Sequence, residues 1–144
     1  MRAQVKNLKS HGVPYATTYV RAGYKHRVSP VLLAAQGSAE SMNFNKAVIE
    51  CRLHSPAGAR GIAQFMPATA RSWNVDPCDV KSSINGQARF MRALLDKFGG
   101  REDLALAAYN SGPARVAKLQ RVPRIRETQN YVRFIQLRKS EWKR

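Results

Sequence analysis

The sequence predicts an all-α, mainly helical protein. Apolar residues recur at steps of three and four over residues 79–98, and no stretch shows the strict alternation of a β-strand. Residues that typically begin and end helices support the same prediction. Ser29-Pro30 is a helix start, and Gly99-Gly100 is a helix stop. The chain has 144 residues, without a repeat or a low-complexity linker, so we expect a single domain over residues 1–144 with one core.

The first two predicted helices precede residue 41. In residues 11–28, Tyr15, Tyr19 and Tyr24 recur at spacings of four to five, which predicts one amphipathic helix ending near Gly23. The next helix starts with Ser29 as N-cap and Pro30 at the first position, and runs for about three turns to Glu40.

Three further helices are predicted in the C-terminal half. Residues 102–110 are apolar on nearly all sides, as expected of a helix buried in the middle of a bundle, and Gly112-Pro113 ends it. A short helix follows through Val116 and Leu119. Residues 125–142 form the last helix, with Tyr131, Val132 and Ile135 facing inward.

The composition is strongly basic. There are 25 Lys and Arg but only 9 Asp and Glu, for a net charge of +16. Such a field favours a polyanionic partner, which could be nucleic acid, an anionic polymer of the bacterial envelope or an acidic membrane surface. No DNA-reading motif or aromatic stacking run accompanies the charge, so we expect no specific nucleic-acid partner. High like charge and small size favour a monomer.

Two cysteines leave three possibilities open. Cys51 and Cys78 are either free and buried or joined to each other. A zinc site that uses Cys51 and His54 is the least favoured, because no paired ligand spacing repeats. We therefore expect neither a metal nor another cofactor.

Glu40 is a candidate acid at the end of its helix. Gln36 and Leu33 lie on the same helical face, so the carboxyl is expected to be partly shielded from water. Shielding disfavours the anion and raises the pKa, as a general acid near neutral pH requires. The other reading, an ordinary solvated Glu, would apply if its neighbours carried no further signal.

Those neighbours carry a family resemblance. Glu40-Ser41 is followed by residues 55–70 (SPAGARGIAQFMPATA), 105–113 (ALAAYNSGP) and 127–132 (ETQNYV). In this order the blocks resemble the soluble lytic transglycosylase domain, whose fold is related to goose-type lysozyme, over roughly residues 30–135. The resemblance implies a lysozyme-like all-α fold and cleavage of peptidoglycan.

The resemblance also implies a mechanism with one carboxyl. Most glycosidases use two carboxyl groups, and no dedicated second carboxylate is evident here. Enzymes of this family use one Glu, which protonates the glycosidic oxygen and then accepts a proton from the 6-hydroxyl of N-acetylmuramic acid. The product is a 1,6-anhydromuramyl end.

The family pattern assigns roles to nine residues. Glu40 would be the acid and base, and Ser41 would cap or orient the helix end that presents it. Gly61 would leave room for the glycan beside the backbone. The other implied contacts with substrate come from the 55–66 segment and from two later blocks: Ser55, Gln64, Met66, Tyr109, Asn110 and Tyr131.

One departure from the family creates a rival acid. Where the family passes from Ala-Val directly to Ser-Pro-Ala-Gly-Ala, this chain inserts residues 49–54, which include Glu50. We prefer Glu40, because it keeps the family register and follows the apolar helix.

Two other functions stay open, as does the route to the wall. A goose-lysozyme-like enzyme would hydrolyse the same bond, and a basic structural or nucleic-acid-binding protein would use residues 115–144 as its contact face. Residues 1–10 are basic without a following apolar run, so we expect no secretory signal. An enzyme of this kind would reach the wall by a phage particle or at lysis, which favours a bacteriophage origin.

Overall fold

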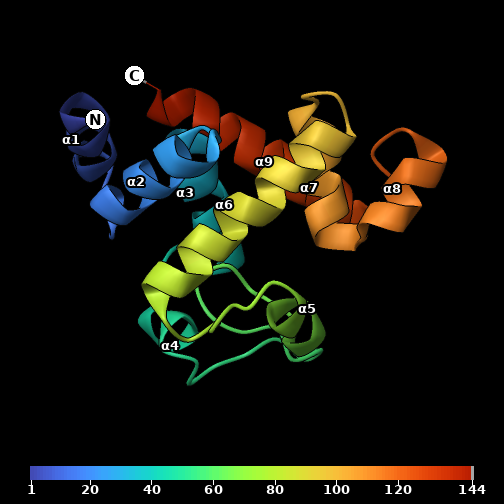
Figure 1. Ribbon diagram of the computed structural model, residues 1–144, viewed down its shortest axis with the longest axis horizontal. Coiled ribbons are helices and arrows are strands. Elements are labelled where there is room, and N and C mark those ends of the chain that lie inside the picture. Colours follow the sequence, from blue (N-terminus) through green and yellow to red (C-terminus); the bar gives the residue numbers. More distant parts are fainter. Residues whose placement is uncertain (144) are drawn as a thin grey trace.

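The computed structural model describes residues 1–143, and Arg144, at the end of the basic C-terminal stretch, lies outside the described part. Helices and loops make up the described chain, as predicted, and no strand occurs in it. The helices are α1 (Arg2–Ser10), α2 (Ala16–His26), α3 (Pro30–Glu40), α4 (Lys46–Ile49), α5 (Pro67–Ser72), α6 (Val80–Lys97), α7 (Glu102–Ser111), α8 (Pro113–Leu119) and α9 (Arg126–Trp142) (Figure 1).

Helix α3 is the centre of the core. It packs against α2 and α9, and it is buried from Pro30 to Ser38 except for Val31. Its start is the predicted one, because the Ser29 hydroxyl accepts a hydrogen bond from the Leu32 N–H at 3.2 Å. Its end at Glu40 is also confirmed. The sequence therefore places the carboxyl at the end of a nearly fully buried helix.

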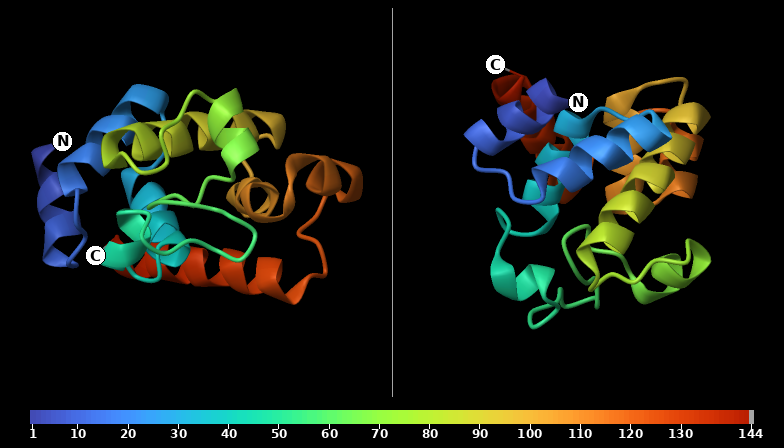
Figure 2. Two further views of the ribbon diagram at one scale, coloured as in Figure 1. Left: turned by 90° about the horizontal axis from the view of Figure 1, so that it is seen from below. Right: turned by 60° about the vertical axis from the view of Figure 1, so that its left-hand side comes forward.

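Helices α6, α7 and α9 enclose the other side of the core. As predicted, α7 is buried over five consecutive residues, from Leu104 to Ala108. It is tied to α9 by Lys139, whose Nζ lies 2.8 Å from Oε1 of Glu102. Figure 2 shows α6 crossing the molecule beside the loops between α4 and α5. These loops and the buried helices together frame the functional site.

The end of helix α2 differs from the predicted end near Gly23. It continues past Gly23 to His26 and ends at Arg27, whose φ is 57°. Gly23 instead permits a close approach of the chain, since a Cβ there would lie 2.5 Å from the Val28 carbonyl oxygen. Gly23 therefore serves close packing within the helix and is not the helix stop that the sequence predicts.

The N-terminal helix α1 was not predicted, because its periodicity is short and mostly polar. It buries Leu8 and contacts the other end of the chain. Nδ2 of Asn7 donates a 2.7 Å hydrogen bond to the Trp142 carbonyl, and the His11 ring stacks on the Trp142 indole with centroids 6.2 Å apart. The two ends of the described chain therefore lie side by side (Figure 1).

The segment between α4 and α6 forms a small apolar cluster of its own, which corrects the expectation of one core. It consists of Ala63, Phe65, Ala70 and Val75. A disulfide joins Cys51 to Cys78 and closes this segment covalently. Both cysteine sulfurs are in this disulfide, so Cys51 has no thiolate for the alternative zinc site.

Candidate active site

A cavity of about 590 Å³ opens beside the end of α3. It is bounded by α3, the loop from 55 to 66, the end of α7 and the first turns of α9. Its lining residues are Ala39, Glu40, Ser55, Pro56, Ala57, Ala59, Gln64, Met66, Tyr109, Asn110, Glu127 and Tyr131. We call this cavity the cleft. Seven residues that the sequence marked as candidates meet there.

Glu40 occupies the inner wall of the cleft as the last residue of α3. Burial raises the pKa of its carboxyl to about 8, and the negative charge of Glu127 acts in the same direction. A hydrogen bond from the Tyr131 hydroxyl to Oε2, 2.7 Å long, opposes this by stabilising the anion. At neutral pH the Glu40 carboxyl therefore holds its proton. The Tyr131 hydroxyl is nevertheless in place to stabilise the carboxylate once that proton has left.

Buried amides support this pair from behind. Nε2 of Gln36 donates to the Tyr131 hydroxyl at 3.0 Å, and Oε1 of Gln36 accepts from Nε2 of Gln87 at 2.8 Å. Nε2 of Gln87 also reaches the Leu33 carbonyl at 3.1 Å. Both glutamines are fully buried, so these contacts fix the amides. Burial and the nearby Glu40 charge raise the pKa of Tyr131 well above its usual range, which keeps its hydroxyl a donor.

Ser41 orients the helix end and does not line the cleft. Its hydroxyl donates to the Gly37 carbonyl at 2.7 Å and accepts from the Phe44 N–H at 2.9 Å. The residue is fully buried, so it acts on the helix end, as the family resemblance implies, and offers no surface to a substrate. Ser41 closes α3 and directs the chain away from Glu40.

Gly61 also lies outside the lining of the cleft. Its φ is 80°, and a Cβ there would come within 1.8 Å of the Pro77 carbonyl oxygen. The space left by the missing side chain is filled by the protein backbone, which corrects the expectation that it makes room for a glycan.

Ser55 and Gln64 form the near edge of the cleft. The Ser55 hydroxyl accepts a hydrogen bond from the Ala59 N–H at 2.9 Å and closes the 55–59 turn. Nε2 of Gln64 donates to the Gly61 carbonyl at 2.9 Å. Met66, which is 41% exposed, completes this edge with an apolar surface.

Tyr109 and Asn110 form the opposite wall. The Tyr109 hydroxyl donates to the Ala63 carbonyl at 2.8 Å, which attaches α7 to the 55–66 loop. Oδ1 of Asn110 accepts a 2.8 Å hydrogen bond from the buried Thr128 hydroxyl on α9. The three sequence blocks are thus joined by hydrogen bonds around one cavity.

Three residues of the site were not assigned roles from the sequence. Glu127 places a second carboxylate in the cleft, from the first turn of α9. Its position at the start of the 127–132 block, which carries part of the family resemblance, could have marked it as a site residue. Gln87 and Thr128 hold the site from buried positions, and such long-range contacts leave no local pattern.

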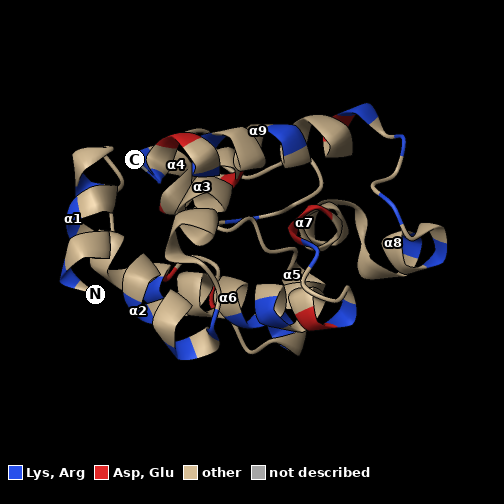
Figure 3. Ribbon diagram, turned by 90° about the horizontal axis from the view of Figure 1, so that it is seen from above, with Lys and Arg blue, Asp and Glu red and all other residues tan. Residues whose placement is uncertain are grey.

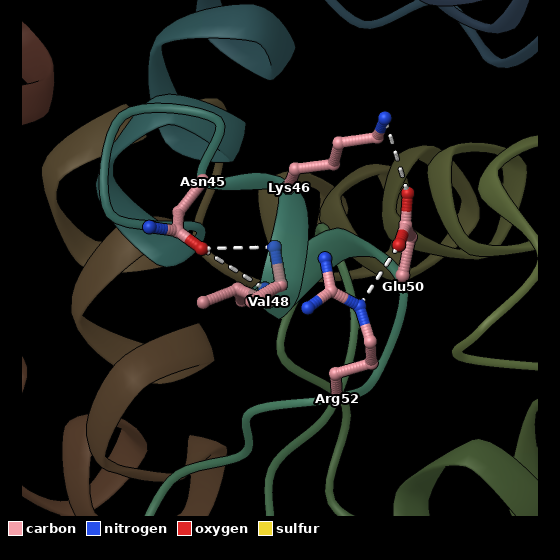
Figure 4. Close-up of polar contacts among 6 residues, drawn as sticks. Asn45, Lys46, Val48, Glu50 and Arg52 are labelled. Atoms are coloured by element: carbon pink, nitrogen blue, oxygen red, sulfur yellow. Dashed lines mark hydrogen bonds and ion pairs between the residues drawn. The ribbon is translucent and has the colours of Figure 1, made fainter.

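Glu50 lies outside the cleft. Its carboxylate is 3.0 Å from Nε of Arg52 and 3.9 Å from Nζ of Lys46, on the exposed surface of the 45–52 segment (Figure 4). This geometry favours Glu40 as the acid.

Three further features of the described residues concern metal sites, membrane-spanning helices and a surface groove. Within residues 1–143 no three His, Cys, Asp or Glu side chains gather closely enough to hold a metal ion. No helix of this part has the length and apolar character needed to cross a bilayer. A separate groove between α1 and α2 is lined by Arg2, Lys6, Lys9 and Arg21 with apolar neighbours, and it contains no acid.

Comparisons with known proteins identify the family and the fold of this chain. The family described as the transglycosylase SLT domain matches residues 18–132. A transglycosylase of Enterobacteria phage PRD1 is 35% identical over 92 residues, which is 63% of this chain and 32% of the relative. This chain therefore spans about a third of that protein.

Two solved structures share the fold. The soluble lytic transglycosylase SLT70 from Escherichia coli has a TM-score of 0.75 at 21% identity, with 91% of this chain and 24% of that chain covered. An inactive Glu-to-Gln mutant of the lytic transglycosylase Slt from Pseudomonas aeruginosa has a TM-score of 0.73 at 22% identity, with 90% and 24% covered. The fold is thus lysozyme-like, as predicted, and the chain belongs to the transglycosylase SLT domain family.

Proposed function

We propose that this chain is a peptidoglycan lytic transglycosylase that cleaves the bond between N-acetylmuramic acid and N-acetylglucosamine without adding water. The observation that carries the proposal is the Glu40 carboxyl, which lies in the cleft of a family member with its pKa raised to about 8. A carboxyl protonated at neutral pH is the group that a general acid requires.

In the proposed reaction Glu40 acts twice. Its carboxyl first gives a proton to the glycosidic oxygen as the bond to C1 of the muramyl sugar breaks. The resulting carboxylate then accepts the proton of the muramyl 6-hydroxyl as that oxygen bonds to C1, which yields the 1,6-anhydro sugar and restores the acid. The second step is intramolecular, so it gains effective concentration and needs no positioned water.

The surrounding residues support both states of the carboxyl. The Tyr131 hydroxyl, held by Gln36, stabilises the carboxylate between the two steps through its hydrogen bond. Ser55, Gln64 and Asn110 offer polar groups to the glycan, while Met66 and Tyr109 offer apolar contact.

Glu127 favours a second candidate, hydrolysis by a goose-lysozyme-like route. It lies in the same cleft and is exposed, so it could activate a water as a base. Mass spectrometry of released muropeptides separates the two, because hydrolysis adds a water to each product and anhydro-sugar formation does not. Under the proposal, Glu127→Gln keeps the anhydro product.

The decisive variants are Glu40→Gln and Glu50→Gln, assayed on purified walls. Under the proposal the first abolishes release of muropeptides and the second leaves it unchanged. Loss of cleavage in the Glu50 variant with retention in the Glu40 variant would overturn the assignment.

The positive charge supports the bacterial wall as the place of action. Lys and Arg are distributed along α1, α2, α6, α8 and α9 (Figure 3). A dispersed field of this kind attracts anionic envelope polymers without reading a sequence, and it favours a monomer. The relative from phage PRD1 supports delivery by a phage. DNA retention at low salt together with no cleavage of walls would instead support the nucleic-acid-binding alternative.

A further inference from the structure

A second cavity, of about 380 Å³, adjoins the cleft at Glu40. The two cavities share Glu40, Ser55, Pro56 and Gln64, so they meet at the carboxyl. The walls that belong to the second cavity alone are Met42, Val48, Leu53 and His54. We call it the side cavity. Leu53 and His54 come from the 49–54 segment, which joins α4 to the loop of the cleft.

The rim of the side cavity is apolar and open. Met42 is 65% exposed and Leu53 is 46% exposed. The backbone that presents Met42 is costly, because Met42, Asn43 and Phe44 have φ values of 55°, 59° and 62°. Ser41 and Arg138 hold this turn, the latter through a 3.1 Å hydrogen bond to Oδ1 of Asn43. A strained turn that exposes a methionine beside a reactive carboxyl indicates a binding role.

The opposite wall is also fixed in place. The N–H groups of Arg52 and Leu53 both donate to the Ala47 carbonyl, at 2.8 and 3.0 Å. Cys51, whose φ is 63°, anchors the same segment to Cys78 through the disulfide. Leu53 is therefore held at the rim before any ligand arrives, which lowers the cost of binding.

The chemistry of the walls indicates what they would bind. A bare glycan presents hydroxyls, which need hydrogen-bonding partners, but three of the four distinctive walls are the side chains of Met42, Val48 and Leu53. A muramyl sugar additionally carries a lactyl group and a stem peptide, both with methyl groups. Nδ1 of His54 lies 3.0 Å from the Ser55 carbonyl, so Nε2 is the nitrogen left for a peptide carbonyl or carboxylate.

We propose that the side cavity is a subsite for the lactyl group and the first stem-peptide residue of a muramyl sugar bound at Glu40. This rests on the proposed function and deepens it. The 49–54 segment would then give this chain a preference for glycan that carries peptides over glycan that has been stripped of them.

The test compares two substrates: peptidoglycan strands with their stem peptides, and the same strands after amidase removes the peptides. Leu53→Ala is expected to raise KM about tenfold on the first substrate. This is at the low end of the range for loss of an apolar contact, because Leu53 is half-exposed. Its kcat on that substrate, and both constants on stripped strands, should stay unchanged. The matched control is Leu137→Ala, since Leu137 on α9 is 61% exposed and lies outside both cavities.

Thermal unfolding of the Leu53 variant, followed by circular dichroism, shows that the change in KM is measured on folded protein. A KM that is unchanged on both substrates, or raised equally on both, overturns the subsite. Glu40→Gln is run in parallel: its activity tests the proposed function alone, so failure of either proposal is recognised separately.

Discussion

The Tyr131 hydroxyl lies 2.7 Å from Oε2 of Glu40 and donates its proton to that oxygen. The same hydroxyl accepts a hydrogen bond from Gln36, so its direction is fixed. Burial raises the pKa of Glu40 while this single bond lowers it. The pair therefore sets how readily the carboxyl gives up and recovers a proton.

Replacing Tyr131 by Phe removes that donor. The carboxylate becomes less stable, so the pKa of Glu40 rises and the alkaline limb of the pH–rate profile moves to higher pH. We expect kcat to fall by about tenfold or more, as for loss of a hydrogen bond to a charged group. Wall-clearing rates measured across pH check both effects. An unmoved alkaline limb would contradict the role given to Tyr131.

Glu40→Gln should stabilise the fold as the pH rises. Below pH 4.5 the carboxyl is protonated in both the folded and the unfolded chain, so the variant and the parent differ little. Between 4.5 and about 8 only the unfolded chain releases the proton, which lowers the parent's free energy of unfolding progressively. Above about 8 the deficit is constant. Urea unfolding of both proteins at several pH values checks this; an advantage of the variant that shrinks with pH would exclude a raised pKa.

Gly61→Ala should destabilise the fold more than Gly58→Ala. Both glycines have positive φ, 80° and 98°, so both variants carry backbone strain. Only at Gly61 would the new Cβ meet the Pro77 carbonyl, whereas at Gly58 nothing lies within 4 Å. We expect an additional loss of about 1–3 kcal/mol at Gly61, measured by denaturant unfolding. Equal losses in the free energy of unfolding would show that the Pro77 carbonyl moves aside at no cost.

Removing the disulfide should lower the free energy of unfolding by about 3–4 kcal/mol, since the cross-link closes a loop of 27 residues. A Cys51→Ser/Cys78→Ser double variant and the reduced parent should show the same loss. The control is a reductant added to the double variant, which should have no effect. If the reductant destabilised the double variant as well, the loss could not be assigned to the cross-link.

The parts of the site that could be predicted are those with local signals. The N-cap at Ser29 fixes where α3 begins, and the run of about three turns after it places Glu40 at the end of the helix. Tyr109 and Asn110 lie in the last turn of α7, whose burial is indicated by its apolar composition. For these residues, the face and the end of the helix could be read directly from spacing.

The remaining parts depend on contacts between distant residues. Gln87 appears in the sequence as one polar residue in an amphipathic helix, yet it is fully buried, and its Nε2 donates hydrogen bonds to Oε1 of Gln36 and to the Leu33 carbonyl. Gly61 lies outside the cleft for a related reason. A small residue next to a reactive group leaves room for a ligand or for the protein itself, and only the packing decides which.

The contact between α1 and α9 has a consequence for how the chain opens. Because Asn7 and His11 both use Trp142, fraying of the last helical turn would remove two of the contacts that hold the first helix, which also packs against α2 and α3. Loss of order at the end of α9 would therefore weaken the attachment of α1, and shortening α9 by a single turn should loosen it.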